Sequence, residues 1–137
     1  MVKELAALVS SVHPDDYYHW NKKRADMLGP MINSVAPERR LHVWFQYCQE
    51  ALNAGNSQAC INEIEEYFRQ QNQPLAGQLN ERTKPVFELL ALAYLRMGEQ
   101  QNCQQHHSPQ SCIIPLQGEG IHQLKTGSQK AINIYQL

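Results

Sequence analysis

The chain has 137 residues, and its 12 lysines and arginines against 13 aspartates and glutamates leave a formal net charge of −1. A chain of this length can bury one core of its own, so we expect a single domain over residues 1–137. The balanced charge, without a basic stripe, argues against nucleic acid as a partner, and no apolar run approaches the roughly 18 residues that a membrane span needs.

Residues 1–36 predict two short N-terminal helices. Apolar residues recur at helical spacing over residues 2–12, and His13-Pro14 then ends the element. The second helix is expected to stop at Gly29-Pro30, because glycine suits a helix C-cap and proline cannot continue a helix. We interpret its clustered aromatic residues as a patch that packs on the next helix: Tyr17, Tyr18 and Trp20.

Residues 37–72 predict a helical hairpin. One helix begins at Pro37 and carries a buried-face pattern as far as Gly55-Asn56, and a second runs from about Gln58 to Gln71. Two helices joined by so short a turn must be antiparallel neighbours.

The pattern returns in residues 82–137. A helix from Pro85 to Met97 is expected to end on Gly98, and its partner helix appears only at Ser128, beyond a loop that we place at residues 101–127. The two copies are offset by about 43 residues, which indicates an internal repeat. Sliding one copy on the other aligns Trp44 with Phe87, Tyr47 with Leu90, Cys48 with Ala91, and Gly55 with Gly98.

These aromatic, small and glycine positions resemble the tetratricopeptide repeat, a pair of antiparallel helices. The resemblance implies an all-α fold of about six helices, with tetratricopeptide-like hairpins and a long Cys/His/Pro/Gly loop inserted in the second hairpin. The repeat-core positions that it implies are Trp44, Tyr47, Cys48, Gly55, Cys60, Phe87, Leu90, Ala91, Tyr94, Gly98, Ala131 and Tyr135.

The segment from Cys103 to His122 has a composition that predicts a loop. It holds two of the four cysteines, three of the six histidines, two prolines and two glycines. Proline lacks a backbone donor and glycine admits backbone angles that other residues avoid, so a helix through this segment is not expected. A loop of about twenty residues inside a compact domain is usually functional or disordered.

Three interpretations of this loop's cysteines and histidines stay open. A Cys103–Cys112 disulfide would close a loop of about ten residues and add roughly 2–3 kcal/mol of stability in an exported protein. Alternatively, Cys103, His107, Cys112 and His122 would hold zinc or copper, since thiolate and imidazole are the ligands that these metals prefer, although the spacing lacks a paired Cys-x2-Cys unit. In the third interpretation the thiols are free and the histidines only pack or donate hydrogen bonds.

A second resemblance covers the loop and its flanks. The segment is similar to the stretch that follows the tetratricopeptide helix in large bacterial proteins of the ASPIC/UnbV type, which resemble animal cartilage acidic protein and continue into FG-GAP propeller repeats. The similarity implies a periplasmic or secreted location, although no signal peptide is visible here, and it implies no established activity. The matching residues are Glu99, Asn102, Cys103, His107, Ser111, Cys112, Pro115, Gly118, Gly120, His122, Gly127, Ser128 and Ala131.

We therefore expect a non-catalytic helical-repeat module that binds a protein or peptide and needs no cofactor. One alternative is a metal-binding or thiol-redox module built on the Cys103–His122 loop. Another is a structural N-terminal segment that docks on a missing C-terminal domain. Two repeats without a polar cap also leave an apolar edge, so the C-terminal helix predicts a homo-oligomer.

Overall fold

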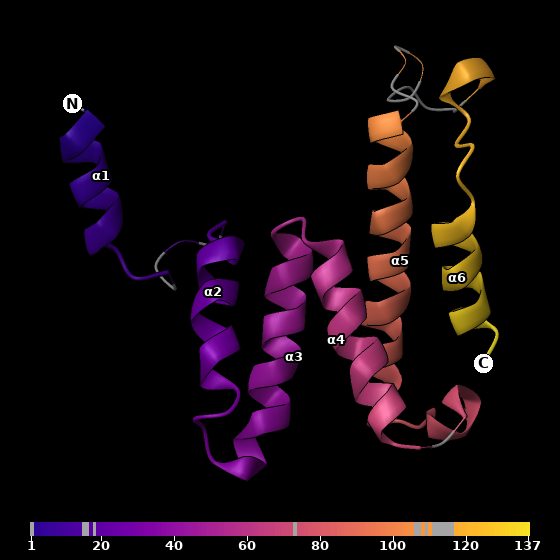
Figure 1. Cartoon of the computed structure of the whole chain (residues 1–137), viewed down its shortest axis with the longest axis horizontal. Helices are drawn as coiled ribbons and strands as arrows, with labels where there is room; N and C mark the ends of the chain where they lie inside the picture. The colour runs from indigo at the N-terminus through magenta and orange to yellow at the C-terminus, as the bar shows by residue number, and fades with distance from the viewer. Residues whose placement is uncertain are drawn as a thin grey trace. The chain divides into compact units, whose positions relative to one another are not determined.

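In a computed structural model, the chain is described at residues 2–14, 17, 19–72, 74–105, 108, 110 and 117–137, and this part of it is helical without strands (Figure 1). The predicted all-α class is thereby confirmed. No helix among the described residues is both long and apolar enough to cross a membrane. The elements are α1 (Val2–Ser11), α2 (Asn21–Met31), α3 (Pro37–Asn53), α4 (Ser57–Gln70), η2 (Leu75–Gln78), α5 (Lys84–Gln105), η3 (Gly118–Gly120) and α6 (Thr126–Tyr135).

The chain divides into two compact units, Met1–Asn56 and Ser57–Leu137. The first unit holds α1, α2 and α3, and the second holds α4, α5 and α6. The division falls in the turn of the hairpin expected at residues 37–72. The pairing of that hairpin's two helices, and the single domain, therefore stay predictions.

In the first unit, α2 and α3 pack against each other (Figure 1). Helix α3 begins with a proline. Proline suits this position because a backbone N–H in the first turn of a helix has no partner within the helix, so lacking one costs nothing. The helix ends in a Schellman motif: Gly55, at φ 85°, donates its N–H to the Leu52 carbonyl, and Asn56 donates to the Ala51 carbonyl. The predicted turn at Gly55 is confirmed.

An ion pair also joins α2 to α3. Arg24 Nε lies 2.9 Å from Glu50 Oε1, and both side chains are largely buried. Asn21 Nδ2 donates to the other carboxylate oxygen at 2.8 Å, and Arg24 Nη1 donates to the Tyr17 carbonyl at 2.6 Å. Arg24 therefore ties the segment before α2 to both helices.

The expected end of α2 at Gly29-Pro30 is wrong, because the helix continues to Met31. Proline in the last turn removes only one hydrogen bond from a helix that is about to end, so the cost is small there. The predicted aromatic patch lies before the helix instead: Tyr17 and Trp20 stack with ring centroids 4.9 Å apart, and Tyr18 lies outside the described residues.

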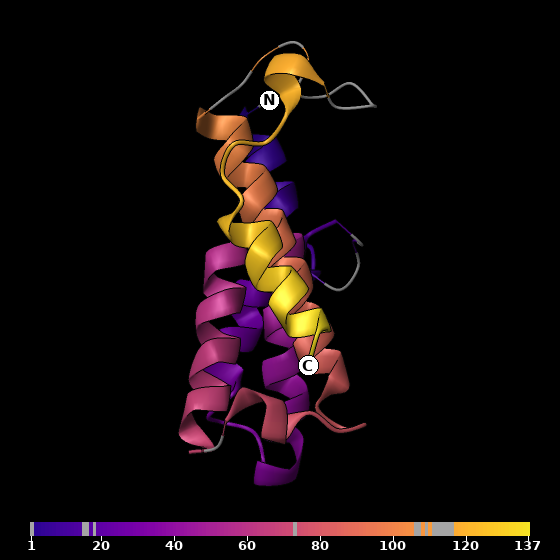
Figure 2. The same cartoon turned by 90° about the vertical axis from the view of Figure 1, so that its right-hand side faces the viewer.

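In the second unit, α5 packs with α4 and with α6 (Figures 1 and 2). The rings of Phe68 on α4 and Phe87 on α5 have centroids 4.4 Å apart. This unit's fully buried aliphatic side chains come from the same helices and include Ile61, Ile64 and Leu90. Burial of these side chains is the main term that holds the three helices together.

The expected end of the fifth helix at Gly98 is also wrong. Helix α5 runs through Gly98 to Gln105, so Cys103 lies in its last turn and not in a loop. A glycine inside a helix costs about 1 kcal/mol relative to alanine. Gly98 lies against the start of α6: a Cβ atom built on it would lie 3.4 Å from the Cα atom of Gly127, an ordinary van der Waals distance. Gly98 therefore lies inside a helix, at its contact with another helix, and not in a turn.

Asn102 anchors the segment that leads into α6. Its side chain is buried, and Nδ2 donates to the Gly98 and Leu124 carbonyls, each at 2.8 Å. Its Oδ1 accepts the Leu124 N–H at 2.9 Å. One amide side chain thus satisfies both backbone groups of Leu124, which fixes where α6 starts.

Candidate functional site: a groove beside the last turn of α6

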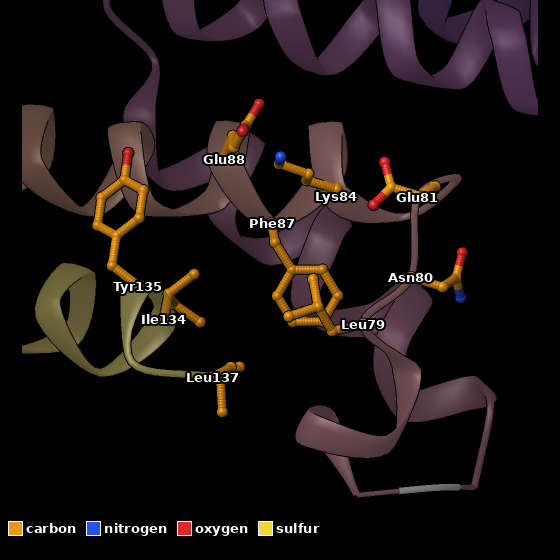
Figure 3. A pocket seen from close by; sticks show the side chains of 9 residues that line it. All are labelled: Leu79, Asn80, Glu81, Lys84, Phe87, Glu88, Ile134, Tyr135 and Leu137. Atoms are coloured by element: carbon orange, nitrogen blue, oxygen red, sulfur yellow. The ribbon is translucent and has the colours of Figure 1, made fainter.

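The second unit has a groove of about 410 Å³ beside the C-terminal end of α6, which we call the α5–α6 groove (Figure 3). Its volume lies in the range of small-ligand pockets, roughly 300–1,000 Å³. It is lined by Leu79, Asn80, Glu81, Lys84, Phe87, Glu88, Ile134, Tyr135 and Leu137.

The groove exists because α6 is shorter than α5. Helix α6 has 10 residues and α5 has 22. Gly127, near the start of α6, lies against Gly98 in the second half of α5, and Ile134 lines the groove together with Phe87 near the start of α5. Only the last turn of α6 therefore reaches the first turns of α5.

A rigid turn supplies the other wall of the groove. The Asn80 side-chain oxygen accepts the N–H groups of Arg82 and Thr83, and the Thr83 hydroxyl donates to the Gln78 carbonyl at 2.6 Å. These bonds satisfy donors at the start of α5, as helix-capping side chains do. They also hold Leu79 and Glu81 at the edge of the groove.

The groove has an apolar floor and a charged rim. In the view of Figure 3, the charged groups of Glu81, Lys84 and Glu88 lie above the apolar side chains, which are those of Leu79, Phe87, Ile134 and Leu137. Two carboxylates against one ammonium group leave the rim with one excess negative charge. The arrangement suits an apolar side chain followed by a basic one.

A second hollow of about 260 Å³ lies on the α4 side of Ile134. Ile134 lines both this hollow and the α5–α6 groove. Its lining is Glu65, Phe68, Arg69, Leu75, Gln78, Leu90, Tyr94 and Ile134.

Two residues that line this second hollow, Glu65 and Tyr94, also contact Lys130 of α6. The buried Tyr94 of α5 donates its hydroxyl to Glu65 Oε1 of α4, and Lys130 Nζ of α6 lies 3.7 Å from the same oxygen and 4.7 Å from the centre of the Tyr94 ring. Burial raises the pKa of Tyr94 well above its ordinary value, and the hydrogen bond and the negative charge of Glu65 raise it further. Tyr94 therefore acts as a hydrogen-bond donor at any physiological pH.

The predicted Cys/His site is only partly within the described residues. Cys103 is exposed on the last turn of α5, and His122 is half-buried in the segment before α6. His107 and Cys112 lie outside the described residues. Asn102 and Leu124 flank the Cys103–His122 segment and are hydrogen-bonded to each other. The two ends of this segment are therefore held close together.

The structure leaves the three interpretations of this loop open. Among the described residues, no group of three or more His, Cys, Asp or Glu side chains is placed to hold a metal, but His107 and Cys112 are not in that set. Of the described cysteines, Cys48 and Cys60 are buried and Cys103 is exposed. The Cys103–Cys112 disulfide and the zinc or copper site stay predictions.

Most of the predicted repeat-core positions are buried, and three are not. Tyr47 is half-buried, Gly55 lies in the exposed turn after α3, and Tyr135 is 65% exposed. The placement of Tyr135 in the core is wrong, because it lies on the last turn of α6, where it lines the groove. The buried positions are Trp44, Cys48, Cys60, Phe87, Leu90, Ala91, Tyr94, Gly98 and Ala131.

Sequence reasoning missed the α5–α6 groove. The composition of residues 70–81 predicts a polar linker, so it gives no reason to place Leu79 in a site. Ile134 and Leu137 lie at the end of a short helix and just beyond it. Their spacing of three residues was the one signal of a shared apolar face.

No match was found when the chain was compared with protein-family models, with curated proteins or with solved structures. The tetratricopeptide and ASPIC/UnbV resemblances therefore stay predictions.

Proposed function

We propose that this chain is a non-catalytic helical module that binds an apolar segment of a partner protein in the α5–α6 groove. The observation that carries the proposal is the groove's floor. Leu79 and Leu137 keep 39% and 44% of their surface exposed beside Phe87 and Ile134. Covering such apolar surface is favourable by roughly 25 cal/mol per Å².

The rim sets the chemistry of the partner. Glu81 and Glu88 flank the apolar floor with one lysine between them, so the preferred segment carries a large aliphatic or aromatic residue with a lysine or arginine close by. Charged groups on a rim contribute mainly to specificity and association rate, while the buried apolar anchor supplies most of the affinity.

The same proposal includes the finer architecture. The antiparallel packing of α5 with α6 supports one tetratricopeptide-like hairpin with the Cys/His loop inserted in it, and the Schellman turn after α3 supports the start of another. In repeat proteins of this kind, binding surfaces are built on rigid stacked helices.

The test is a peptide selection against the whole chain, followed by anisotropy measurements with labelled peptides. Leu79→Lys combined with Leu137→Lys should weaken binding of the selected peptides at least about tenfold, because two exposed floor residues are replaced by charges. The matched control is the combination of Leu5→Lys with Leu8→Lys, which changes two exposed leucines of α1.

Two outcomes of this selection count against the proposal. Selected peptides that bind the groove variant as tightly as the unchanged chain would place the binding surface elsewhere. Selected peptides without an apolar residue beside a basic one would contradict the proposed partner chemistry.

A further inference from the structure

A stripe of side chains on α5 faces away from α4. At about 100° per residue, five positions fall within roughly 80° of arc: Lys84, Glu88, Leu92, Leu95 and Glu99. All five side chains are exposed. Three of them are charged, and the other two, Leu92 and Leu95, are apolar with 43% and 37% of their surface exposed. Two neighbouring exposed leucines between charged ends indicate an interaction surface.

Helix α6 extends the same surface. Lys130 reaches Glu65 on the α4 side, so Ile132 and Tyr135 lie on the opposite side of α6. They are 48% and 65% exposed. Tyr135 also lines the groove together with Glu88 of the stripe (Figure 3), so the stripe and the exposed side of α6 meet at these two residues. We call Leu92, Leu95, Ile132 and Tyr135 the apolar face.

The charge pattern of the stripe is self-complementary. Lys84 is at one end and Glu99 at the other, so a twofold axis beside Leu92 brings Lys84 of each copy opposite Glu99 of the other copy. The same axis brings Glu88 toward Arg96 of the other copy. Within one copy, Arg96 lies 3.5 Å from Glu99. Each end of the contact would therefore join Lys84 and Glu88 of one copy to Glu99 and Arg96 of the other.

The same axis also suits α6. Gly98 of α5 lies against Gly127 of α6, and the two helices are antiparallel. The axis beside Leu92 is about six residues before Gly98 in α5, so it lies about six residues after Gly127 in α6. This places the axis between Ile132 and Tyr135. Each Ile132 then faces Tyr135 of the second copy.

From these relationships we infer that a second copy of this chain is the partner of the apolar face. Two α5 helices and two α6 helices form an antiparallel four-helix layer around one twofold axis. Isologous contacts of this kind close on themselves and give a dimer, not a filament. Lys84, Glu88 and Tyr135 belong both to this contact and to the lining of the α5–α6 groove, so the dimer is measured without any peptide.

Sedimentation equilibrium on the whole chain tests the dimer. Lys84→Glu and Glu99→Lys should each raise the dimer dissociation constant about tenfold or more, since each creates two like-charge contacts. An equimolar mixture of the two variants should dimerise as the unchanged chain does, because both contacts are then between opposite charges. Leu92→Glu should weaken the dimer more strongly, by about a hundredfold.

The reciprocal rescue separates this contact from general loss of structure, and circular dichroism checks that each variant is folded. A chain that is monomeric at all concentrations would overturn the inference. A dimer that both charge variants leave intact, or a mixture that recovers nothing, would overturn it equally.

Discussion

Gly127 of α6 lies so close to α5 that it has no room for a side chain. A Cβ atom built on it would lie 2.5 Å from the Tyr94 carbonyl oxygen and 2.8 Å from the Cα atom of Gly98. These are backbone atoms, which cannot move aside as the end of a flexible side chain can. The contact sets the distance between α5 and α6, and with it the shape of the groove at the end of α6.

Gly127→Ala should therefore destabilise the second unit by about 2 kcal/mol or more, because the added methyl group forces the two helices apart. Gly98→Ala should be nearly neutral: its Cβ atom meets Gly127 at 3.4 Å, and alanine is the better helix former by about 1 kcal/mol. Urea unfolding of both variants measures this, with Gly77→Ala as a control because nothing lies within 4 Å of its Cβ position. Equal effects at Gly98 and Gly127 would contradict the described contact.

Asn102→Ala should free the segment before α6. The substitution removes three hydrogen bonds and leaves the Leu124 N–H and carbonyl without them, at an expected cost of about 2–3 kcal/mol. Hydrogen exchange at the Leu124 amide should accelerate more than at amides in the middle of α4. Gln104→Ala, at an exposed position of the same helix turn, is the control, and slow exchange at Leu124 in the Asn102 variant would refute the anchor.

Tyr94 should make the second unit sensitive to alkali. Its pKa is raised in the folded chain, first by burial and then by Glu65, so its contribution to stability is complete below the unfolded pKa of about 10 and is lost as pH rises above that value. Urea midpoints between about pH 8 and pH 11 should fall more steeply for the unchanged chain than for Tyr94→Phe. Tyr135→Phe, at an exposed tyrosine, should keep the steeper fall. Parallel pH profiles for all three proteins would show that Tyr94 is not buried against a carboxylate.

Arg24→Ala should loosen the first unit. It leaves the partly buried Glu50 carboxylate with Asn21 but without its cation, which we expect to cost about 2 kcal/mol. Lys22→Ala removes only the exposed pair with Asp26 and should cost no more than about 0.5 kcal/mol. Hydrogen exchange of α2 and α3 amides in the two variants gives the comparison, and equal protection would argue against a structural role for the Arg24–Glu50 pair.

The Cys103–Cys112 disulfide has a direct test. The unreduced chain should be two hydrogens lighter by mass spectrometry than the reduced chain, with one linked peptide that contains both cysteines. A mass that falls on chelation instead would favour the zinc or copper site. If the mass changes neither on reduction nor on chelation, the thiols are free. The buried Cys48 and Cys60 give an internal control, since they should remain unmodified by a thiol reagent in the folded chain.

Much of the helical architecture could be predicted from sequence because it depends on local chemistry. Pro37 starts α3 and Gly55 follows it, and both act through backbone geometry that the sequence displays directly. Gly98 has the same local signature as Gly55 but lies inside α5, against Gly127 of α6. Sequence position alone does not distinguish a glycine that ends a helix from one that lies inside a helix at a contact with another helix.

The candidate site was harder to predict, since it depends on relative helix lengths and on distant residues. The groove needs Leu79, Phe87 and Leu137 together, and no local pattern links these three positions. The Tyr94–Glu65 hydrogen bond likewise joins residues whose pairing becomes visible only once α4 and α5 are packed.

Chemical-shift mapping tests the peptide-binding groove most directly. When a selected peptide is added to the ¹⁵N-labelled chain, we predict that the largest amide shifts will fall in residues 79–88 and 132–137, which carry the lining of the groove. The shifts should disappear with Leu79→Lys combined with Leu137→Lys, while the α1 control variant keeps them. Shifts concentrated in α2 and α3, or a bound peptide that leaves the groove amides unchanged, would contradict the proposed function.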